Sequence, residues 1–210
     1  MRHDDARRAA IATNLARFER AQFQPTEPPP LKALRRAAVC LIVADDGEGN
    51  AALVLTRRAA KLKDHAGQWA LPGGRMEAGE TPVQAALREA HEEINLELPA
   101  EAVLGHLDDY PTRSGYLITP IVVWAPPGAV MSENPAEVAK IYRIPLLELH
   151  QDEPEFFNIP ESDNPVIRYP LQGKYIHAPT AAVLYQFVEV VLNGRDTRVA
   201  HLEQPVWAWK

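Results

Sequence analysis

Residues 71–96 constrain this chain more than any other stretch, because a glycine-containing loop leads directly into a helix with signals at both ends. Thr81 suits the N-cap, Pro82 suits the first helical position, and Gln84 falls where its amide can close a capping box. Asn95 tolerates the left-handed conformation that commonly follows a helix. A helix is therefore predicted from about Pro82 to near Asn95.

The predicted helix has an apolar side and an acidic side. At roughly 100° per residue, one apolar stripe runs along it; the stripe consists of Val83, Ala86, Leu87, Ala90 and Ile94. Glu89, Glu92 and Glu93 gather on the opposite side. Glutamates three and four apart repel one another by about 0.2–0.5 kcal/mol per pair, so a cation is expected there. Oxygen ligands without cysteine or paired histidine favour Mg²⁺ or Mn²⁺ over zinc.

The spacing of charged residues in this stretch carries a resemblance. Gly74 is followed by five residues, Glu80, seven residues, Arg88-Glu89, an apolar residue, His91 and Glu92-Glu93. This pattern resembles the Nudix box, with Asn95 in place of the final glycine of the family. Since asparagine accepts the same backbone conformation, we expect that departure to be silent.

The resemblance implies a fold, a reaction class and residue roles. The implied fold is α/β, a Nudix α/β/α sandwich with a mixed β-sheet, and the implied activity is metal-dependent cleavage of a nucleoside diphosphate derivative. The implied metal ligands are Glu89, Glu92, Glu93 and the Gly74 carbonyl oxygen. Arg88 would orient the carboxylates, and Glu80 would fix the loop to the helix. The catalytic base is left open between Glu137, from a later loop, and Glu89.

Residues 55–74 supply local positive charge just before the predicted metal site. Arg57, Arg58, Lys61 and Lys63 lie within seven residues of one another. Charged side chains of this kind bind phosphate oxygens. The predicted substrate contacts are Arg57, Arg58, Lys63, Gly73 and Gly74, and the alternative is a basic loop exposed to solvent.

The same stretch narrows the resemblance to one branch of the family. It is similar to the signature that precedes the Nudix box in coenzyme A pyrophosphatases; the matching residues are Leu55, Thr56, Arg58, Ala59, Gly67, Leu71 and the Pro-Gly-Gly that follows. Lys63 replaces an arginine and keeps its charge but not its bidentate fork. A second departure is His177-Ala178, where the branch usually has Trp-Gly. Tyr116, in a further matching segment, is predicted either to stack on adenine or to pack in the core.

The resemblance implies hydrolysis of coenzyme A or acyl-coenzyme A to 3′,5′-ADP and (acyl-)4′-phosphopantetheine. Two alternatives remain at this point. One is a Nudix pyrophosphatase for ADP-ribose, NADH or another nucleoside diphosphate derivative. The other is a Nudix-like sensor that binds a nucleotide without turning it over.

Composition limits the class of protein. A chain of 210 residues with 46% apolar content can bury one good core. The net charge of −6 argues against nucleic acid or an anionic membrane as the main partner. The lone Cys40 lies in an apolar run and is expected in the core. With neither a disulfide framework nor an apolar span, we expect a cytoplasmic protein. A homodimer is compatible with the sequence.

The remaining pattern predicts the other elements of the fold. We expect a helix within residues 4–23, a proline-rich connector, and a hairpin of residues 35–44 and 51–57. Residues 121–124 and 138–144 are predicted strands, residues 151–163 an exposed loop, residues 166–177 a late hairpin, and residues 179–193 a helix. The predicted organisation is an N-terminal helix and connector (1–34), a Nudix domain (35–194) and a C-terminal tail (195–210).

Overall fold

The computed structural model describes residues 1–23, 34–62 and 66–208. Lys63, the predicted proline connector and Trp209 therefore lie outside the described residues. Among the described residues, no helix combines the length and the apolar character that crossing a bilayer requires.

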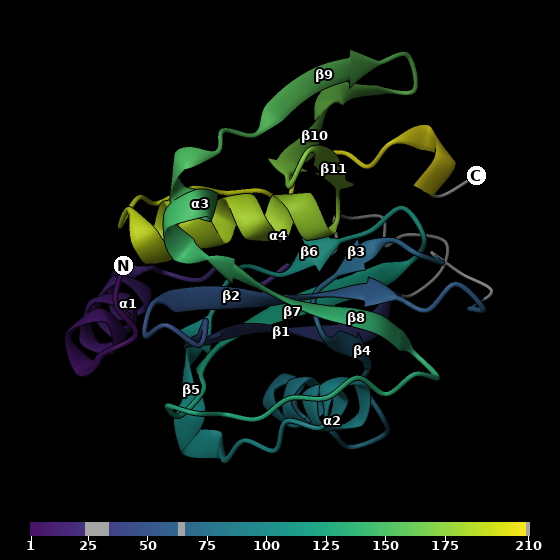
Figure 1. Ribbon diagram of the computed structural model, residues 1–210. Coiled ribbons are helices and arrows are strands. Elements are labelled where there is room, and N and C mark those ends of the chain that lie inside the picture. The colour runs from purple at the N-terminus through teal and green to yellow at the C-terminus, as the bar shows by residue number, and fades with distance from the viewer. Residues whose placement is uncertain (24–33, 63–65, 209–210) are drawn as a thin grey trace.

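A mixed β-sheet forms the centre of the molecule (Figure 1). Strand β1 (Arg35–Asp45) pairs in parallel with β7 (Tyr116–Trp124) and antiparallel with β2 (Ala51–Arg58). Strand β8 (Val138–Pro145) pairs with β2, and short strands complete the sheet. These are β3 (Trp69–Ala70), β4 (Gly73–Arg75), β5 (Val103–His106) and β6 (Tyr110–Pro111). β1 and β2 are almost continuously apolar because both faces of the sheet are covered.

Helices cover both faces of this sheet (Figure 1). Helix α2 (Pro82–Ile94) packs on one face, against residues such as Ile42 and Ile121. Helix α4 (Thr180–Gln186) lies on the other face and continues as a π-helical segment, η2 (Phe187–Leu192). The short helix α3 (Leu146–Gln151) follows strand β8. A single helical turn, η1 (Ala100–Ala102), precedes strand β5. The predicted α/β/α sandwich with a mixed sheet is confirmed.

The N-terminal helix α1 (Asp5–Arg17) packs beside the main sheet. Asp4 caps it by accepting a hydrogen bond from the Arg7 backbone N–H at 2.8 Å. Ile11 and Leu15, which lie four residues apart and so share one face of the helix, are buried. Cys40 is fully buried in β1, also as expected.

The C-terminal part differs from the sequence prediction. Residues 151–163, expected to be an exposed loop, contribute β9 (Glu155–Ile159) and the start of β10 (Ser162–Leu171). The prolines of this stretch misled the prediction, because Pro154 and Pro160 lie just outside the two ends of β9 and remove no hydrogen bond from within the strand. With β11 (Lys174–His177), these strands form a second, three-stranded antiparallel sheet. The hairpin predicted over residues 166–177 is present as β10 and β11, and its turn residues Gln172 and Gly173 both have positive φ, 48° and 71°.

Candidate active site

Helix α2 forms as its local signals predict. The Thr81 hydroxyl accepts a hydrogen bond from the Gln84 N–H at 3.3 Å, and the Thr81 N–H donates to the Gln84 side chain at 2.9 Å. Caps of this kind stabilise a helix by about 1 kcal/mol. At the other end, Asn95 adopts the left-handed conformation, with φ 51° and ψ 32°. Its side chain also donates to the Ser132 hydroxyl at 2.9 Å, which ties the helix end to a distant loop.

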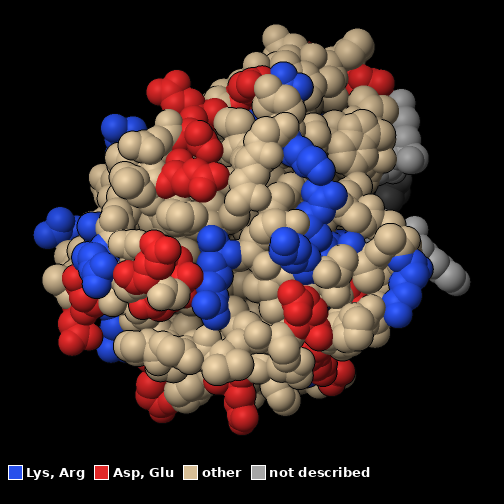
Figure 2. All heavy atoms as spheres, in the orientation of Figure 1, with Lys and Arg blue, Asp and Glu red and all other residues tan. Residues whose placement is uncertain are grey.

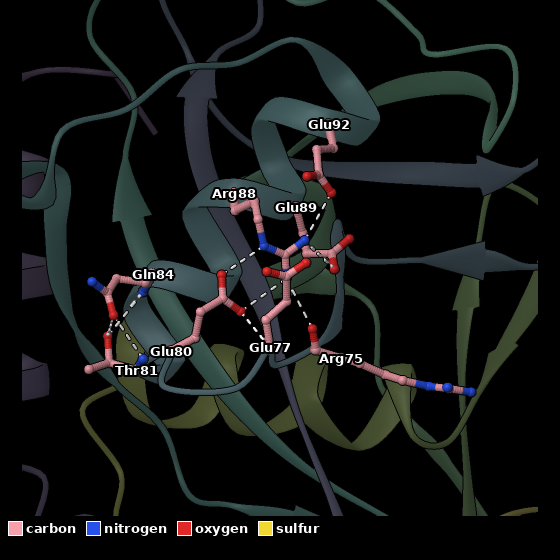
Figure 3. A network of polar contacts seen from close by, with 8 residues as sticks. All are labelled: Arg75, Glu77, Glu80, Thr81, Gln84, Arg88, Glu89 and Glu92. Carbon is pink, nitrogen blue, oxygen red and sulfur yellow. Dashed lines mark hydrogen bonds and ion pairs between the residues drawn. The ribbon is translucent and has the colours of Figure 1, made fainter.

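Arg88 is the centre of a charged network on α2 (Figure 3). Its guanidinium holds both carboxylate oxygens of Glu80, at 2.7 and 3.1 Å. Its Nη1 donates to Glu89 and to Glu92, each at 2.9 Å. Its Nη2 also donates to the backbone carbonyl of Arg75 at 3.0 Å. One side chain therefore links the loop, the helix start and two of the predicted metal ligands.

Glu93 is not on the outer side of α2, where the sequence prediction placed it with Glu89 and Glu92; it follows Ala90 by three residues and therefore lies at the edge of the apolar stripe. It was expected on the acidic outer side, but it is only 3% exposed. The reason is that the Gly73 loop folds over this part of α2, and a backbone hydrogen bond from Gly73 reaches the Glu93 carboxylate. Burial, reinforced by the charges of Glu89 and Glu137, raises the pKa of Glu93 to about 8 despite the nearby Arg58.

Glu89 lies half-buried between the helix and the glycine loop. A side chain at Gly74 would overlap the Glu89 carboxylate, so glycine there permits the close approach. Burial raises the pKa of Glu89, and Glu92 and Glu137 act in the same direction, while the Arg88 guanidinium opposes them. Glu92 is exposed, as are Glu77 and His91.

A loop some 40 residues further along the chain brings Glu137 to this site. The Asn134 side chain donates to the Glu92 carbonyl at 3.0 Å, and the Asn134 N–H donates to the Glu93 carbonyl at 2.9 Å. The Glu137 carbonyl in turn accepts from the Ala59 N–H at 2.8 Å. Since the charge of Glu137 raises the pKa of both Glu89 and Glu93, the three carboxylates share one site.

The donor set at this site suits a hard divalent cation. Glu89, Glu92, Glu93 and Glu137 offer carboxylate oxygens, and Gly74 of the glycine loop lies directly against Glu89. Within the described ranges, no three acidic, histidine or cysteine side chains are already grouped for metal coordination. Two of the glutamates, Glu89 and Glu92, instead form ion pairs with Arg88, whose guanidinium donates to them. The buried Glu93 carboxylate and its acidic neighbours nevertheless make a cation electrostatically favourable there.

A cleft of about 980 Å³ opens beside the glycine loop. Arg57, Arg58, Gly73 and Gly74 line it, which brings four of the five predicted substrate contacts together. Lys61 is exposed and is not among the lining residues. Figure 2 shows basic side chains forming a strip in the region of β3 and β11 on the face in view, with acidic side chains to its left and below it. Local positive charge thus exists on a chain whose net charge is negative.

Several lining residues were not anticipated from the sequence. Arg35, Trp69 and Arg75 come from the main sheet; Tyr175, His177 and Trp207 come from the C-terminal part. The sequence predicts that Tyr116 either stacks on adenine or packs in the core. Its side chain is half-buried in the wall of the cleft. The guanidinium of Arg35 lies 4.0 Å from its ring centroid, and Arg75 Nε donates to its hydroxyl at 2.9 Å.

Comparisons with known proteins agree with this geometry. The family model described as "NUDIX domain" matches residues 33–163. A curated relative from Photorhabdus laumondii, named "Uncharacterized Nudix hydrolase NudL", is 39% identical over 178 residues, which cover 81% of this chain and 94% of the relative. A relative of the same name from Yersinia enterocolitica is 38% identical over 62% of this chain and 67% of its own length.

A solved structure shares the fold. The Nudix hydrolase RenU from M. smegmatis superposes with a TM-score of 0.51 at 24% identity, covering 80% of this chain and 93% of RenU. The family model spans more than half of the chain, and the Photorhabdus relative is matched over nearly its whole length. The chain therefore belongs to the Nudix family and is a Nudix pyrophosphohydrolase.

Proposed function

We propose that this enzyme hydrolyses the diphosphate of coenzyme A or of an acyl-coenzyme A, with Mg²⁺ or Mn²⁺, to 3′,5′-ADP and (acyl-)4′-phosphopantetheine. The observation that carries the proposal is the meeting of two motifs. Arg58, from the segment similar to coenzyme A pyrophosphatases, acts electrostatically on Glu93 of the Nudix helix. Both segments border one cleft through Arg58, Gly73 and Gly74.

The size and charge of the cleft support a large anionic substrate. Its volume of about 980 Å³ lies at the upper end of the range for small-molecule sites, about 300–1,000 Å³. Arg57 and Arg58 lie beside the glycine loop, where a diphosphate would be held close to the glutamates of α2. Arg35 and Arg75 extend the positive charge along the wall that carries Tyr116. A substrate with a diphosphate and a further phosphate suits this distribution.

In the proposed reaction, Glu89, Glu92, Glu93 and the Gly74 carbonyl would hold the divalent cation. A bound cation supplies Lewis-acid polarisation of the phosphate and a lowered pKa for the attacking water. Arg88 keeps Glu89 and Glu92 oriented, and its contact with Glu80 fixes the guanidinium itself. Glu137, or alternatively Glu89, would accept the proton of the water. Arg57 and Arg58 would bind the diphosphate oxygens.

Two other functions remain as competing proposals. A pyrophosphatase for ADP-ribose or NADH would use the same carboxylates and the same arginines. A nucleotide sensor would need the cleft but not the acidic set. The network that links Arg88 to three glutamates favours turnover, because a binding module has no need of such an arrangement.

The experiment that separates these functions compares kcat/KM for coenzyme A, acetyl-coenzyme A, ADP-ribose and NADH, each with Mg²⁺ and with Mn²⁺. A parallel reaction with EDTA is the control for metal dependence. The highest kcat/KM is expected for coenzyme A or acetyl-coenzyme A. A higher value for ADP-ribose or NADH would refute the coenzyme A assignment, and binding without turnover of all four would support the sensor.

A further inference from the structure

The C-terminal segment is fixed against the body of the protein. The Glu203 N–H donates to the Pro165 carbonyl at 2.8 Å, beside β10. Arg113 binds the Glu203 carboxylate through two nitrogens, at 3.0 and 2.5 Å, and the Arg113 N–H donates to the Gln204 side chain at 2.8 Å. These contacts join the loop of Arg113 to the C-terminal segment of Glu203, 90 residues further along the chain. The segment that follows, η3 (Val206–Ala208), is held at the edge of the cleft.

Trp207 is the aromatic residue that this segment brings to the cleft. Its side chain lines the cleft, yet the residue is 54% exposed. Its indole meets the His177 ring edge-on, with centroids 5.1 Å apart and an interplanar angle of 82°. A half-exposed indole that lines a cleft leaves a large flat apolar surface available to a ligand.

The other aromatic rings in the cleft wall are already covered by cations. Arg35 lies over the Tyr116 ring at 4.0 Å, and Arg168 lies over the Tyr175 ring at 3.9 Å. Trp69 packs on Tyr142 with a centroid distance of 4.6 Å, and Arg57 lies 5.3 Å from its ring. At each of these positions an arginine or a packed ring therefore already competes with a planar ligand group for contact with the ring. At Trp207 the ring contact is a near-perpendicular one with the imidazole of His177.

We propose that Trp207 forms the nucleobase subsite of this cleft, stacking on the base of the nucleotide whose diphosphate lies at Gly73 and Gly74. This inference rests on the proposed function only in taking the ligand to be a nucleoside diphosphate derivative. The C-terminal turn lies on the side of the small sheet, across from the edge of the main sheet that carries β3 (Figure 1). The base and the diphosphate would thus be bound by different walls of one cleft.

The test uses a pair of ligands that differ only by the nucleoside. These are α,β-methylene-ADP, which resists cleavage of its diphosphate, and methylenediphosphonate, which lacks the nucleoside; both are titrated calorimetrically in Mg²⁺. Trp207→Ala is expected to weaken α,β-methylene-ADP binding about tenfold, as expected for loss of one stacked base, and to leave methylenediphosphonate binding unchanged. Trp207→Phe should retain most of the affinity. Phe156→Ala, which removes another exposed aromatic outside the cleft lining, should bind both ligands like the wild type.

Unchanged α,β-methylene-ADP binding by Trp207→Ala would overturn the inference, as would an equal loss for both ligands or no binding of this nucleotide by the wild type. These outcomes are distinct from failure of the proposed substrate. If the enzyme prefers ADP-ribose but Trp207→Ala selectively loses the nucleotide, the subsite stands and the coenzyme A assignment fails. If coenzyme A is cleaved but its KM is unaffected by Trp207→Ala, the assignment stands and the subsite fails.

Discussion

Arg88 donates to both carboxylate oxygens of Glu80, from Nε to Oε1 at 2.7 Å and from Nη2 to Oε2 at 3.1 Å. The hydrogen bonds from Arg88 are the main reason that the pKa of Glu80 lies below its usual range. The same guanidinium donates to Glu89 and Glu92, so its position sets theirs. The loop and the acidic face of α2 are therefore coupled through one planar side chain.

Replacing Arg88 by Lys tests this coupling. Lysine keeps the charge but lacks the fork that serves Glu80 and the helix glutamates together. We expect kcat/KM to fall by about 10- to 100-fold, as for other groups that orient metal ligands, with the fold retained. Steady-state kinetics and circular dichroism provide the measurement. Arg195→Lys, in an exposed ion pair with Glu189, is the matched control and should be silent; wild-type kinetics in Arg88→Lys would contradict the account.

Replacing Glu93 by Gln separates stability from metal binding. The side chain is 3% exposed and lies beside two other carboxylates, and its pKa is raised to about 8. At pH 7 the carboxyl is ionised in the unfolded chain but mostly protonated in the folded one, and a neutral isostere avoids the free-energy cost of that protonation. We expect the metal-free variant to be as stable as the wild type or more stable, by roughly 1 kcal/mol. The increase in Tm on adding Mg²⁺ should be reduced or lost. Glu77→Gln, at an exposed loop position, serves as control, and a wild-type Mg²⁺ response in Glu93→Gln would argue against Glu93 as a ligand.

Replacing Glu89 and Glu137 by Gln one at a time identifies the catalytic base. The variant that removes the base should lose about 10²- to 10⁴-fold in kcat while still binding metal. Loss of metal binding together with turnover instead marks a ligand. Isothermal titration with Mn²⁺ and single-turnover kinetics measure the two properties. Glu133→Gln, in the same loop as Glu137, is the control. Full activity in both test variants would show that neither residue is the base.

The anchor of the C-terminal segment predicts a defined pH dependence. The Arg113 hydrogen bond is the main cause of the lowered pKa of Glu203. A carboxyl group with a lowered folded-state pKa stabilises the fold fully above its unfolded pKa, about 4.3, and loses that contribution as the pH falls through the folded value. The wild type should therefore be more stable than Glu203→Gln at pH 7, with the difference shrinking below about pH 4. Urea unfolding at several pH values measures this; a difference that persists or grows in acid would contradict it.

The parts of the structure that the sequence predicts well are those with local causes. Thr81, Pro82 and Gln84 define the start of α2 through contacts within four residues, and Asn95 marks its end. Cys40 lies in an apolar run long enough to indicate a buried strand. The order of layers followed from the resemblance, since a mixed sheet with helices on both faces has no unique signature in the pattern of elements.

The features that the sequence did not predict depend on contacts between segments that are far apart in the chain. A helical projection places Glu93 at the edge of the apolar stripe, three residues after Ala90, but the sequence prediction grouped it with the outer glutamates. Its burial under the glycine loop, which depends on a contact outside the helix, was therefore missed. The sequence around Trp207 contains no pattern that marks it as a cleft residue. Its position depends on the ion pair between Glu203 and Arg113, which are 90 residues apart in the chain. Strand β9 was obscured by the neighbouring prolines, which lie just outside its two ends.

The central claim is that the enzyme cleaves the phosphoanhydride bond within the diphosphate of coenzyme A. The most direct test incubates the purified protein with coenzyme A and Mg²⁺, with an EDTA control, and identifies the products by mass. The account predicts 3′,5′-ADP and 4′-phosphopantetheine in equal amounts, and neither of them in EDTA. Intact coenzyme A under conditions in which ADP-ribose or NADH is consumed, or release of inorganic phosphate with dephospho-coenzyme A, would contradict it.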